Sequence, residues 1–330
     1  MIHGTALTET LGIEVPLICG AMYPCSNPEL VAAVSEAGGI GIVQPLSLSY
    51  VHGYDFREGL RYIRTLTDKP IGVNLIIERS SKKYLERVYA WLDIALEEGV
   101  PFLVTALGKP DQVVARTQAA GVTVYHDVTS RLFAEKALDA GVDGFICVNN
   151  RAGGHAGEMS AAELLDEIGP LGKPLVCAGG IGTSEDFAAA IGSGYAGAQL
   201  GTRFIATDEC TAHDGYKQAI IAAGADDIVL SEKITGVPVS IIRTPFIARM
   251  GVRAGPLAKW LLRGRRTRHW MRTAYSLQSV WKLKRAALRG MGYRDIYQAG
   301  KSVDGIHAVQ PAAEVVRQYA AALHANGVMQ

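Results

Sequence analysis

The sequence lacks a long apolar run. Its 330 residues contain no stretch near the roughly 20 apolar residues that a membrane-spanning helix requires. The first residues, MIHGTALTETLGIEVP, lack the basic start and apolar core of a secretory signal. Hydrophobic residues make up 48% and charged residues 20% of the chain, which is typical of globular proteins. We therefore predict a soluble cytoplasmic protein that does not associate with membranes.

Cysteine is scarce and is not arranged for a metal centre. The five cysteines form no CxxC pair and their number is odd, which argues against both a zinc site and a full set of disulfides. Two of them, Cys147 and Cys177, lie in apolar runs that resemble strands, where buried structural thiols are expected. We predict reduced thiols and no metal. The cysteines are Cys19, Cys25, Cys147, Cys177 and Cys210.

Acidic residues are absent between Glu232 and Asp295, while the same segment carries fifteen lysines and arginines. The net charge of the whole chain is only +1, so this is a basic segment attached to an acidic remainder. Such a segment is a candidate surface for phosphates, acidic proteins or nucleic acid. A nucleic-acid-binding module is one alternative, but we predict no nucleic-acid partner because the remainder of the chain indicates an enzyme.

Eight short apolar runs alternate with helical patterns up to about residue 206. The runs are continuous and rich in Val, Ile and Leu, as in parallel strands that are buried on both faces. Helical patterns such as 27–39, 130–141 and 183–194 begin with a capping residue and end with glycine. Eight such units predict an α/β fold, a (β/α)8 TIM barrel. An open doubly wound sheet is the alternative, although no GxGxxG follows the first run. The runs are 16–20, 39–43, 71–75, 102–106, 122–126, 144–148, 174–178 and 197–201.

The pattern changes after Cys210. Residues 213–224 and 311–327 have helical patterns, and three of the four tryptophans lie in the basic segment between them. We predict three parts: a barrel over 1–225, a smaller, mainly helical basic cap over 226–302 that contributes to substrate binding, and a segment over 303–330 that returns to the barrel.

Two glycine-rich loops follow the seventh and eighth runs, where TIM barrels commonly bind phosphate. They are AGGIGTSED at 178–186 and LGTRF at 200–204. Backbone N–H groups in such loops can hold an anion. One glycine loop could be only a turn, but two at consecutive positions predict a phosphate-bearing ligand. Since no GKS or GKT sequence is present, we predict a phosphate-tailed cofactor rather than a nucleoside triphosphate.

Polar and soft side chains follow other runs. Asn74 ends the third run, His126 and Asp127 end the fifth, and Ala21 and Met22 follow the first. Each alone could be ordinary loop packing. Because the carboxyl ends of barrel strands meet at one mouth, their convergence predicts a site there.

The loop after the sixth run, NNRAGGHAG at 149–157, places His155 among glycines. Gly153, Gly154 and Gly157 leave room for a planar ligand beside the imidazole. An imidazole titrates near neutral pH, so His155 could act as an acid, a base or a hydrogen-bond donor. The alternative is a histidine that only bonds a backbone carbonyl; its position at the mouth favours a functional group.

Together these motifs resemble the nitronate monooxygenase family, formerly called 2-nitropropane dioxygenases. The matching sequences are GAM, GVN, AGGHAG, AGGI and LGTRFIAT, and the resemblance extends from the first run to YQAGKSVDGIHAVQP near the C-terminus. It implies a TIM barrel with non-covalent FMN and His155 as the active-site histidine near the reactive edge of the flavin. The implied phosphate contacts are Gly179, Gly180, Gly201 and Thr202. The other predicted flavin contacts are Ala21, Met22, Asn74, His126, Gly153, Gly154 and Ala178.

The resemblance implies that a nitronate reduces FMN and that oxygen then yields a carbonyl compound and nitrite. The small-molecule partners would be the nitronate and O2, and a homodimer remains open. An NAD(P)H-dependent reductase of quinones or enoyl thioesters is the alternative, because related flavin reductases share the AGGH loop. The basic cluster 263–272 could then bind a 2′-phosphate or an acidic carrier protein. Some relatives have lysine where this chain has Asp127, which could change the substrate accepted.

Overall fold

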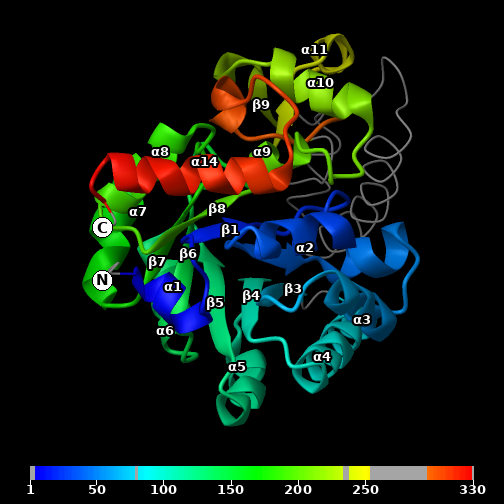
Figure 1. The fold of residues 1–330 in the computed structure, drawn as a ribbon, viewed down its shortest axis with the longest axis vertical. Helices are drawn as coiled ribbons and strands as arrows, with labels where there is room; N and C mark the ends of the chain where they lie inside the picture. Colours follow the sequence, from blue (N-terminus) through cyan, green and yellow to red (C-terminus); the bar gives the residue numbers. More distant parts are fainter. Residues whose placement is uncertain (1–3, 79–80, 233–237, 253–295, 329–330) are drawn as a thin grey trace, which may run out of the picture.

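Eight parallel strands close into a barrel in the order β1 to β8, with β8 paired to β1 (Figure 1). The computed structural model describes residues 4–78, 81–232, 238–252 and 296–328. Each strand overlaps one of the eight predicted runs, which confirms the (β/α)8 barrel. The strands are β1 Leu17–Cys19, β2 Ile40–Val43, β3 Ile71–Ile77, β4 Phe102–Leu107, β5 Thr123–Val128, β6 Gly144–Val148, β7 Leu175–Ala178 and β8 Gly197–Leu200.

Helices surround the strands, as the alternating sequence pattern predicts. Of the capping residues that begin the predicted patterns, Thr183 forms a capping box at α8, whereas Asn27 and Ser130 occupy the N-cap positions of α2 and α6 without a side-chain cap bond. Ser160 forms a second capping box, at α7. No helix within the described ranges is both long and apolar enough to cross a membrane. The helices of the barrel region are α1 Ala6–Leu11, α2 Pro28–Glu36, α3 Phe56–Leu66, α4 Lys82–Glu97, α5 Asp111–Thr117, α6 Arg131–Leu138, α7 Ala161–Ile168, α8 Ser184–Gly192, α9 Thr202–Ile205 and α10 Asp214–Ala222.

Alternate residues along each strand separate into an inner and an outer apolar layer. Leu7, Leu11 and Ile13, from α1 and the turn after it, pack into the inner layer. Since a methyl group at Gly197, the first residue of β8, would meet Leu7, α1 seals the amino-terminal end of the barrel. The inner layer of the strands contains Ile18, Ile40, Ile42, Phe102, Val104, Tyr125, Ile146, Val176 and Ala178.

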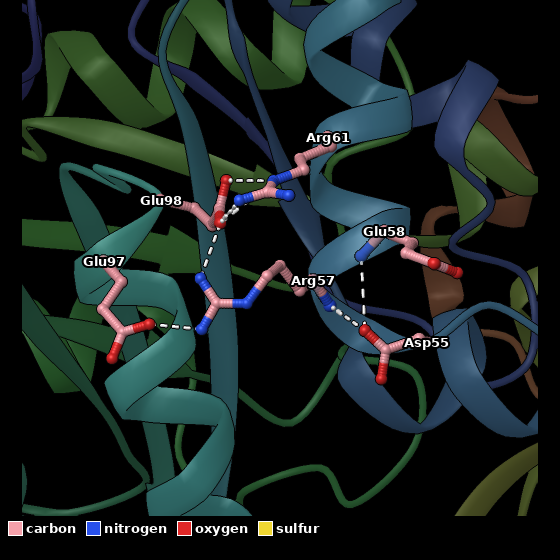
Figure 2. Close-up of polar contacts among 6 residues, drawn as sticks. All are labelled: Asp55, Arg57, Glu58, Arg61, Glu97 and Glu98. Carbon is pink, nitrogen blue, oxygen red and sulfur yellow. Dashed lines mark hydrogen bonds and ion pairs between the residues drawn. The ribbon is translucent and has the colours of Figure 1, made fainter.

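A polar cluster joins α3 to the end of α4 outside the barrel (Figure 2). Asp55 caps α3 by accepting from the backbone N–H groups of Arg57 and Glu58. Glu98 accepts from Arg57 at 2.7 Å and from Arg61 at 2.9 Å. Two arginines on one helix thus hold one carboxylate at the end of the next.

The described part of the predicted cap contains two short strands, which the helical prediction did not include. β9 Ile228–Ser231 and β10 Val239–Ile242 pair antiparallel and are followed by α11 Pro245–Met250. Both strands are four-residue runs rich in Val and Ile, a composition that suits a strand and is too short for a stable helix. The basic cluster 263–272 and the rest of 253–295 lie outside the described residues.

The C-terminal helix α14 Ala312–Ala325 lies within the predicted helix 311–327 and packs against α8 and α2 (Figure 1). Tyr319 contacts the ring of Phe187 at 5.4 Å between centroids and donates a hydrogen bond to Gly182 O at 2.6 Å. A short 3-10 helix, Lys301–Gly305, precedes it. The final segment is thereby attached directly to the loop after β7.

All five cysteines are free, as predicted, and all five are buried, which was predicted only for Cys147 and Cys177. Burial raises the pKa of Cys147 and of Cys177, so both thiols stay protonated at neutral pH. Within the ranges that the structure describes, no three His, Cys, Asp or Glu side chains gather as a metal site would require. These cysteines therefore act as packing residues.

Candidate active site

The loops after β1, β6 and β8 meet at the carboxyl end of the barrel. Gly201 faces Met22, whose sulfur would lie 3.5 Å from a methyl group at that glycine. Thr202 Oγ1 accepts a hydrogen bond from Gly300 N at 3.0 Å, and Gly153 packs closely against Gly300. Predicted site residues from three loops, 22, 153 and 201–202, are thus brought together at one rim.

The loop after β7 adds two glycines that the chain needs for their conformation. Gly179 and Gly180 have φ of 120° and 79°, which other residues rarely adopt. A methyl group at Gly179 would also clash with Asn149 Oδ1 and lie 2.6 Å from the backbone nitrogen of Ala152. The loops after β6 and β7 therefore touch through backbone atoms, with Ala178 buried beneath them.

Asn149 holds these two loops together, a role that sequence reasoning missed. Its Nδ2 donates to Gly179 O at 2.9 Å, and its Oδ1 accepts from Arg151 N at 2.8 Å. The side chain is buried, so the two bonds satisfy amide atoms whose burial without a hydrogen-bond partner would cost free energy. The signal was present, because an asparagine directly after a buried strand often bonds nearby backbone.

The phosphate-binding prediction can be tested against the hydrogen bonds of these loops. Within the part of the chain that the structure describes, the backbone N–H groups of Gly180 and Gly201 have no hydrogen-bond partner. Unsatisfied N–H groups at two neighbouring glycine loops match what a phosphate group requires. The residues present therefore fit the phosphate end of FMN.

His155 lies in the loop after β6, at the mouth of the barrel. Its side chain remains exposed, yet surrounding protein desolvates the imidazole and lowers its pKa. The loop around it is fixed: Gly154 O accepts from Ser240 N of β10 at 2.8 Å, and Gly157 N donates to Asn149 O at 3.2 Å. At neutral pH the imidazole is therefore uncharged and able to donate one hydrogen bond and accept another.

Asn74 and His126 lie on different faces of the barrel wall. Asn74 alternates with the outer-layer residues Val73 and Leu75, so it faces the interior, where its Nδ2 donates to Val104 O at 3.4 Å. His126 lies between the outer-layer residues Val124 and Val128 and therefore faces outward. This position gives no support to the predicted flavin contact of His126.

His126 has a structural partner on the neighbouring strand. Its Nδ1 lies 2.8 Å from Thr105 Oγ1 on β4. Burial lowers its pKa to about 4, so the imidazole is neutral at physiological pH and behaves as a satisfied polar group of the outer layer.

Asp127 faces the interior, on the same side of β5 as Tyr125. The carboxyl is half-buried, and its Oδ1 is buried without a hydrogen-bond partner in the described structure. Burial raises its pKa to about 7. A carboxyl group that exchanges its proton near neutral pH therefore lies at the carboxyl end of the barrel beside the mouth.

Comparison with known proteins gives a consistent picture. The sequence profile described as nitronate monooxygenase matches residues 4–321. A Staphylococcus saprophyticus protein named probable nitronate monooxygenase is 31% identical, over 74% of this chain and 80% of its own length. A Rhodococcus jostii protein named (3aS,4S,5R,7aS)-5-hydroxy-7a-methyl-1-oxo-octahydro-1H-indene-4-carboxyl-CoA dehydrogenase is 32% identical, over 74% of this chain and 67% of its own length.

Solved structures agree over almost the whole chain. FabK from Thermotoga maritima superposes with a TM-score of 0.80 at 28% identity, covering 98% of this chain and 97% of that one. Nitroalkane oxidase from Streptomyces ansochromogenes has a TM-score of 0.78 at 25% identity, covering 97% and 98%. The profile match, the relatives and the barrel show that the chain belongs to the nitronate monooxygenase family, a family of flavin-dependent oxidoreductases.

Proposed function

We propose that the protein uses FMN to oxidise alkyl nitronates with molecular oxygen, giving a carbonyl compound and nitrite. The observation that carries this proposal is the meeting of the glycine loops after β6, β7 and β8 beside His155 at the carboxyl end of the barrel. Family membership supports the oxidation of nitronates. A nitronate and O2 are the proposed small-molecule partners, and the cytoplasm is the proposed location.

The chain would position the cofactor and the substrate. Bound FMN supplies a two-electron acceptor that oxygen can reoxidise. The rim residues on the loops after β1 and β6 border the space above the barrel, and Asn74 offers an amide from its interior face. Neutral His155 donates a hydrogen bond to the nitro group, where negative charge is concentrated. The proposed phosphate contacts are Gly179, Gly180, Gly201 and Thr202, and the proposed ring and ribityl contacts are Ala21, Met22, Asn74, Gly153, Gly154 and Ala178.

The direct test mixes the purified flavoprotein with propyl-2-nitronate in the absence of oxygen. We expect the flavin absorbance to bleach, and we expect nitrite to be released when air is admitted. A protein that carries FMN but does not bleach with any alkyl nitronate would contradict the proposal.

His155→Asn tests the role of the imidazole. The amide retains one hydrogen-bond donor but not its geometry, so we expect bound FMN to be retained and kcat/KM for the nitronate to fall about 100-fold. Flavin content, measured by absorbance after denaturation, separates loss of chemistry from loss of cofactor. Unchanged turnover with full flavin content would reject the role.

A second candidate is a dehydrogenase or reductase that acts on a thioester. Its support is the 32% identity to the Rhodococcus jostii protein, whose name specifies a carboxyl-CoA substrate. Anaerobic reduction of the flavin by NADH, NADPH and nitronate, measured side by side, separates the candidates. Fast reduction by a nicotinamide nucleotide without reduction by nitronate would favour the second.

A further inference from the structure

Arg203 is a buried cation whose charge no carboxylate neutralises. It follows Thr202 on the short helix α9, and only 3% of its surface is exposed. Its Nη2 donates to Ala206 O at 3.1 Å and to Ala308 O at 3.2 Å. Among the residues that the structure describes, Nη1 and Nε have no hydrogen-bond partner and no acid forms an ion pair with the guanidinium.

A buried guanidinium without a counter-charge is costly for the fold. The two carbonyl oxygens satisfy Nη2, which leaves the three N–H groups of Nη1 and Nε. Of these two atoms, Nε is buried and Nη1 is accessible. Burial raises the pKa of the neighbouring Tyr319, so this phenol is neutral and does not offset the charge. Because a nearby anion stabilises a desolvated cation, the surroundings of Arg203 favour a negatively charged ligand.

Arg203 lines a cavity of about 150 Å³ between the start of α8 and the C-terminal helix α14. Tyr319 of α14 and Gln310, from the segment before that helix, line the same cavity. Since a water molecule occupies about 30 Å³ in the liquid, the cavity has room for about five waters. A small anion fits this volume, whereas a flavin or a nucleotide does not.

The first turn of α8 adds backbone donors to the cavity. Its capping box uses three N–H groups: the Asp186 carboxylate accepts from Gly182 N and Thr183 N, and Thr183 Oγ1 accepts from Asp186 N. Ser184 and Glu185, which also line the cavity, have backbone N–H groups without a partner in the described part of the chain. α8 has nine residues, and the free N–H groups at the start of such a helix attract an anion.

This cavity, which we call the Arg203 pocket, is separate from the proposed flavin-phosphate site. No residue that lines it is a predicted flavin contact. The backbone between the two is closely packed, because a methyl group at Gly182 would meet Ser302 O and one at Gly305 would lie 2.6 Å from Gly182 C. Tyr319 donates to Gly182 O. The Arg203 pocket therefore lies outside the barrel, where α14 packs against α8 (Figure 1).

We propose that the Arg203 pocket binds a small tetrahedral oxoanion of the phosphate and sulfate class. Nη1 of Arg203 donates to the anion from α9, and the backbone N–H groups of Ser184 and Glu185 donate from α8. A tetrahedral oxoanion has an acceptor oxygen for each direction, so it can use donors from both helices at once. The exposed Glu185 carboxylate acts against an anion and keeps the affinity moderate.

The bound anion joins the barrel to the C-terminal segment. Gln310 is half-buried, and its side-chain amide forms no hydrogen bond in the described structure, so it can supply a third donor from the segment that precedes α14. An anion held by α8, α9 and Gln310 connects parts of the chain more than a hundred residues apart. Because it binds only the folded chain, it should raise the stability of the protein as its concentration rises.

The first experiment measures the binding of inorganic phosphate by isothermal titration calorimetry. The protein is saturated with FMN, which keeps phosphate out of the flavin site, and chloride holds the ionic strength constant. We expect one saturable site for phosphate that sulfate competes for. Glycerol phosphate separates two sources of this chemistry: weaker binding indicates the free anion, and tighter binding indicates the phosphoryl group of a larger molecule. The absence of saturable binding by phosphate and sulfate would overturn the proposal.

The second experiment removes donors one at a time. Proline is compatible with the first position of a helix, so Ser184→Pro removes one N–H donor without breaking α8. We expect phosphate to bind about tenfold more weakly to Ser184→Pro and about 100-fold more weakly to Arg203→Gln. Glu185→Gln should bind phosphate more tightly. Ala161→Pro, at the equivalent position of α7 behind the other capping box, is the matched control and should bind as the wild type does.

Thermal unfolding with FMN present gives an independent readout. We expect phosphate to raise Tm more than chloride does at the same ionic strength in the wild type and in Ala161→Pro, and this difference should shrink in Ser184→Pro. If Arg203→Gln does not fold, because it also loses its bonds to Ala206 O and Ala308 O, Ser184→Pro and Glu185→Gln test the pocket without it. Equal phosphate affinity in Ser184→Pro, Glu185→Gln and Ala161→Pro would overturn the proposal.

Discussion

Two consecutive residues of β5 titrate in opposite directions. His126, on the outer face, has its pKa lowered from 6.5 to about 4, and Asp127, on the inner face, has its pKa raised from 3.8 to about 7. Between about pH 4 and pH 6.5, the unfolded chain holds the proton of His126 and the folded chain holds that of Asp127. Acidification through this window therefore destabilises the fold through His126 and stabilises it through Asp127.

Single substitutions should reveal how each of the two residues contributes to the pH dependence of stability. We expect Asp127→Asn to remove the stabilising effect of acid and to keep the destabilising effect of His126. The free energy of unfolding should then fall by roughly 3 kcal/mol more than in the wild type from about pH 7 to about pH 4.5. His126→Gln should do the reverse, with stability rising relative to the wild type on acidification. Urea unfolding at the two pH values measures both, and equal pH dependence in all three proteins would contradict the assignment.

Sequence alone suggested candidate residues for this site but not their orientation. His155 and the glycines stood out through loop position and spacing. The dipeptide His126–Asp127 also stood out at a strand end, yet which of the two faces the interior depends on the phase of β5 in the closed barrel. One residue of phase reverses every side chain on a strand, and a short apolar run does not define that phase.

Ion pairs join side chains of α3 to the end of α4, outside the candidate site (Figure 2). Glu98 lies at the carboxyl end of α4, where the helix dipole disfavours a negative charge. Hydrogen bonds first from Arg61 and then from Arg57 lower its pKa. The two arginines therefore offset the unfavourable interaction between the Glu98 carboxylate and the helix dipole.

Glu98→Gln should lower Tm by about 2 °C at low salt and neutral pH, because exposed ion pairs contribute little individually. The pKa of Glu98 is lower in the folded state, so its contribution is present above the unfolded pKa and is lost as the pH falls through the folded value. The difference from wild type should therefore vanish in acid, and also in about 1 M salt. Glu86→Gln, which breaks only the long, exposed 3.9 Å pair with Lys82, is the matched control and should leave Tm unchanged. A difference that persists in acid would contradict this account.

Elements of the barrel were predictable because their signals are local. Continuous Val, Ile and Leu runs bounded by caps and glycines mark parallel strands and their helices. β9 and β10 were missed because a basic, helix-rich composition around them dominated the interpretation of 226–302. Their pairing joins residues separated by the chain segment 232–238. The sequence of this segment has no short hairpin-turn motif that would predict the pairing.

Across the whole molecule, the returning segment near residue 300 ties distant loops together. Lys301 N donates to Arg151 O at 2.8 Å, and Gly300 N donates to Thr202 Oγ1 at 3.0 Å. The loops after β6 and β8 are therefore held by a segment that lies 150 and 98 residues further along the chain from Arg151 and Thr202. Neither partner could be predicted from sequence, because these contacts depend on the path of the chain after the barrel closes.

Gly300→Ala should disrupt this connection. A methyl group there would lie 2.6 Å from Gly153 N and 2.7 Å from Arg151 O, so the backbones must separate. We expect the free energy of unfolding to fall by about 2 kcal/mol and FMN to bind roughly tenfold more weakly, as measured by flavin fluorescence. Gly224→Ala, whose added methyl would make only an ordinary 3.6 Å contact with Asp304, should change neither quantity. Equal behaviour of the two variants would contradict the role of Gly300.

The seal that α1 forms at the amino-terminal end has a kinetic consequence. With Leu7, Leu11 and Ile13 filling that end, molecules reach the interior face of Asp127 and Asn74 from the carboxyl end. Under the proposed function, an organic substrate and dioxygen would share this one route, so we expect a bound substrate to slow the arrival of oxygen.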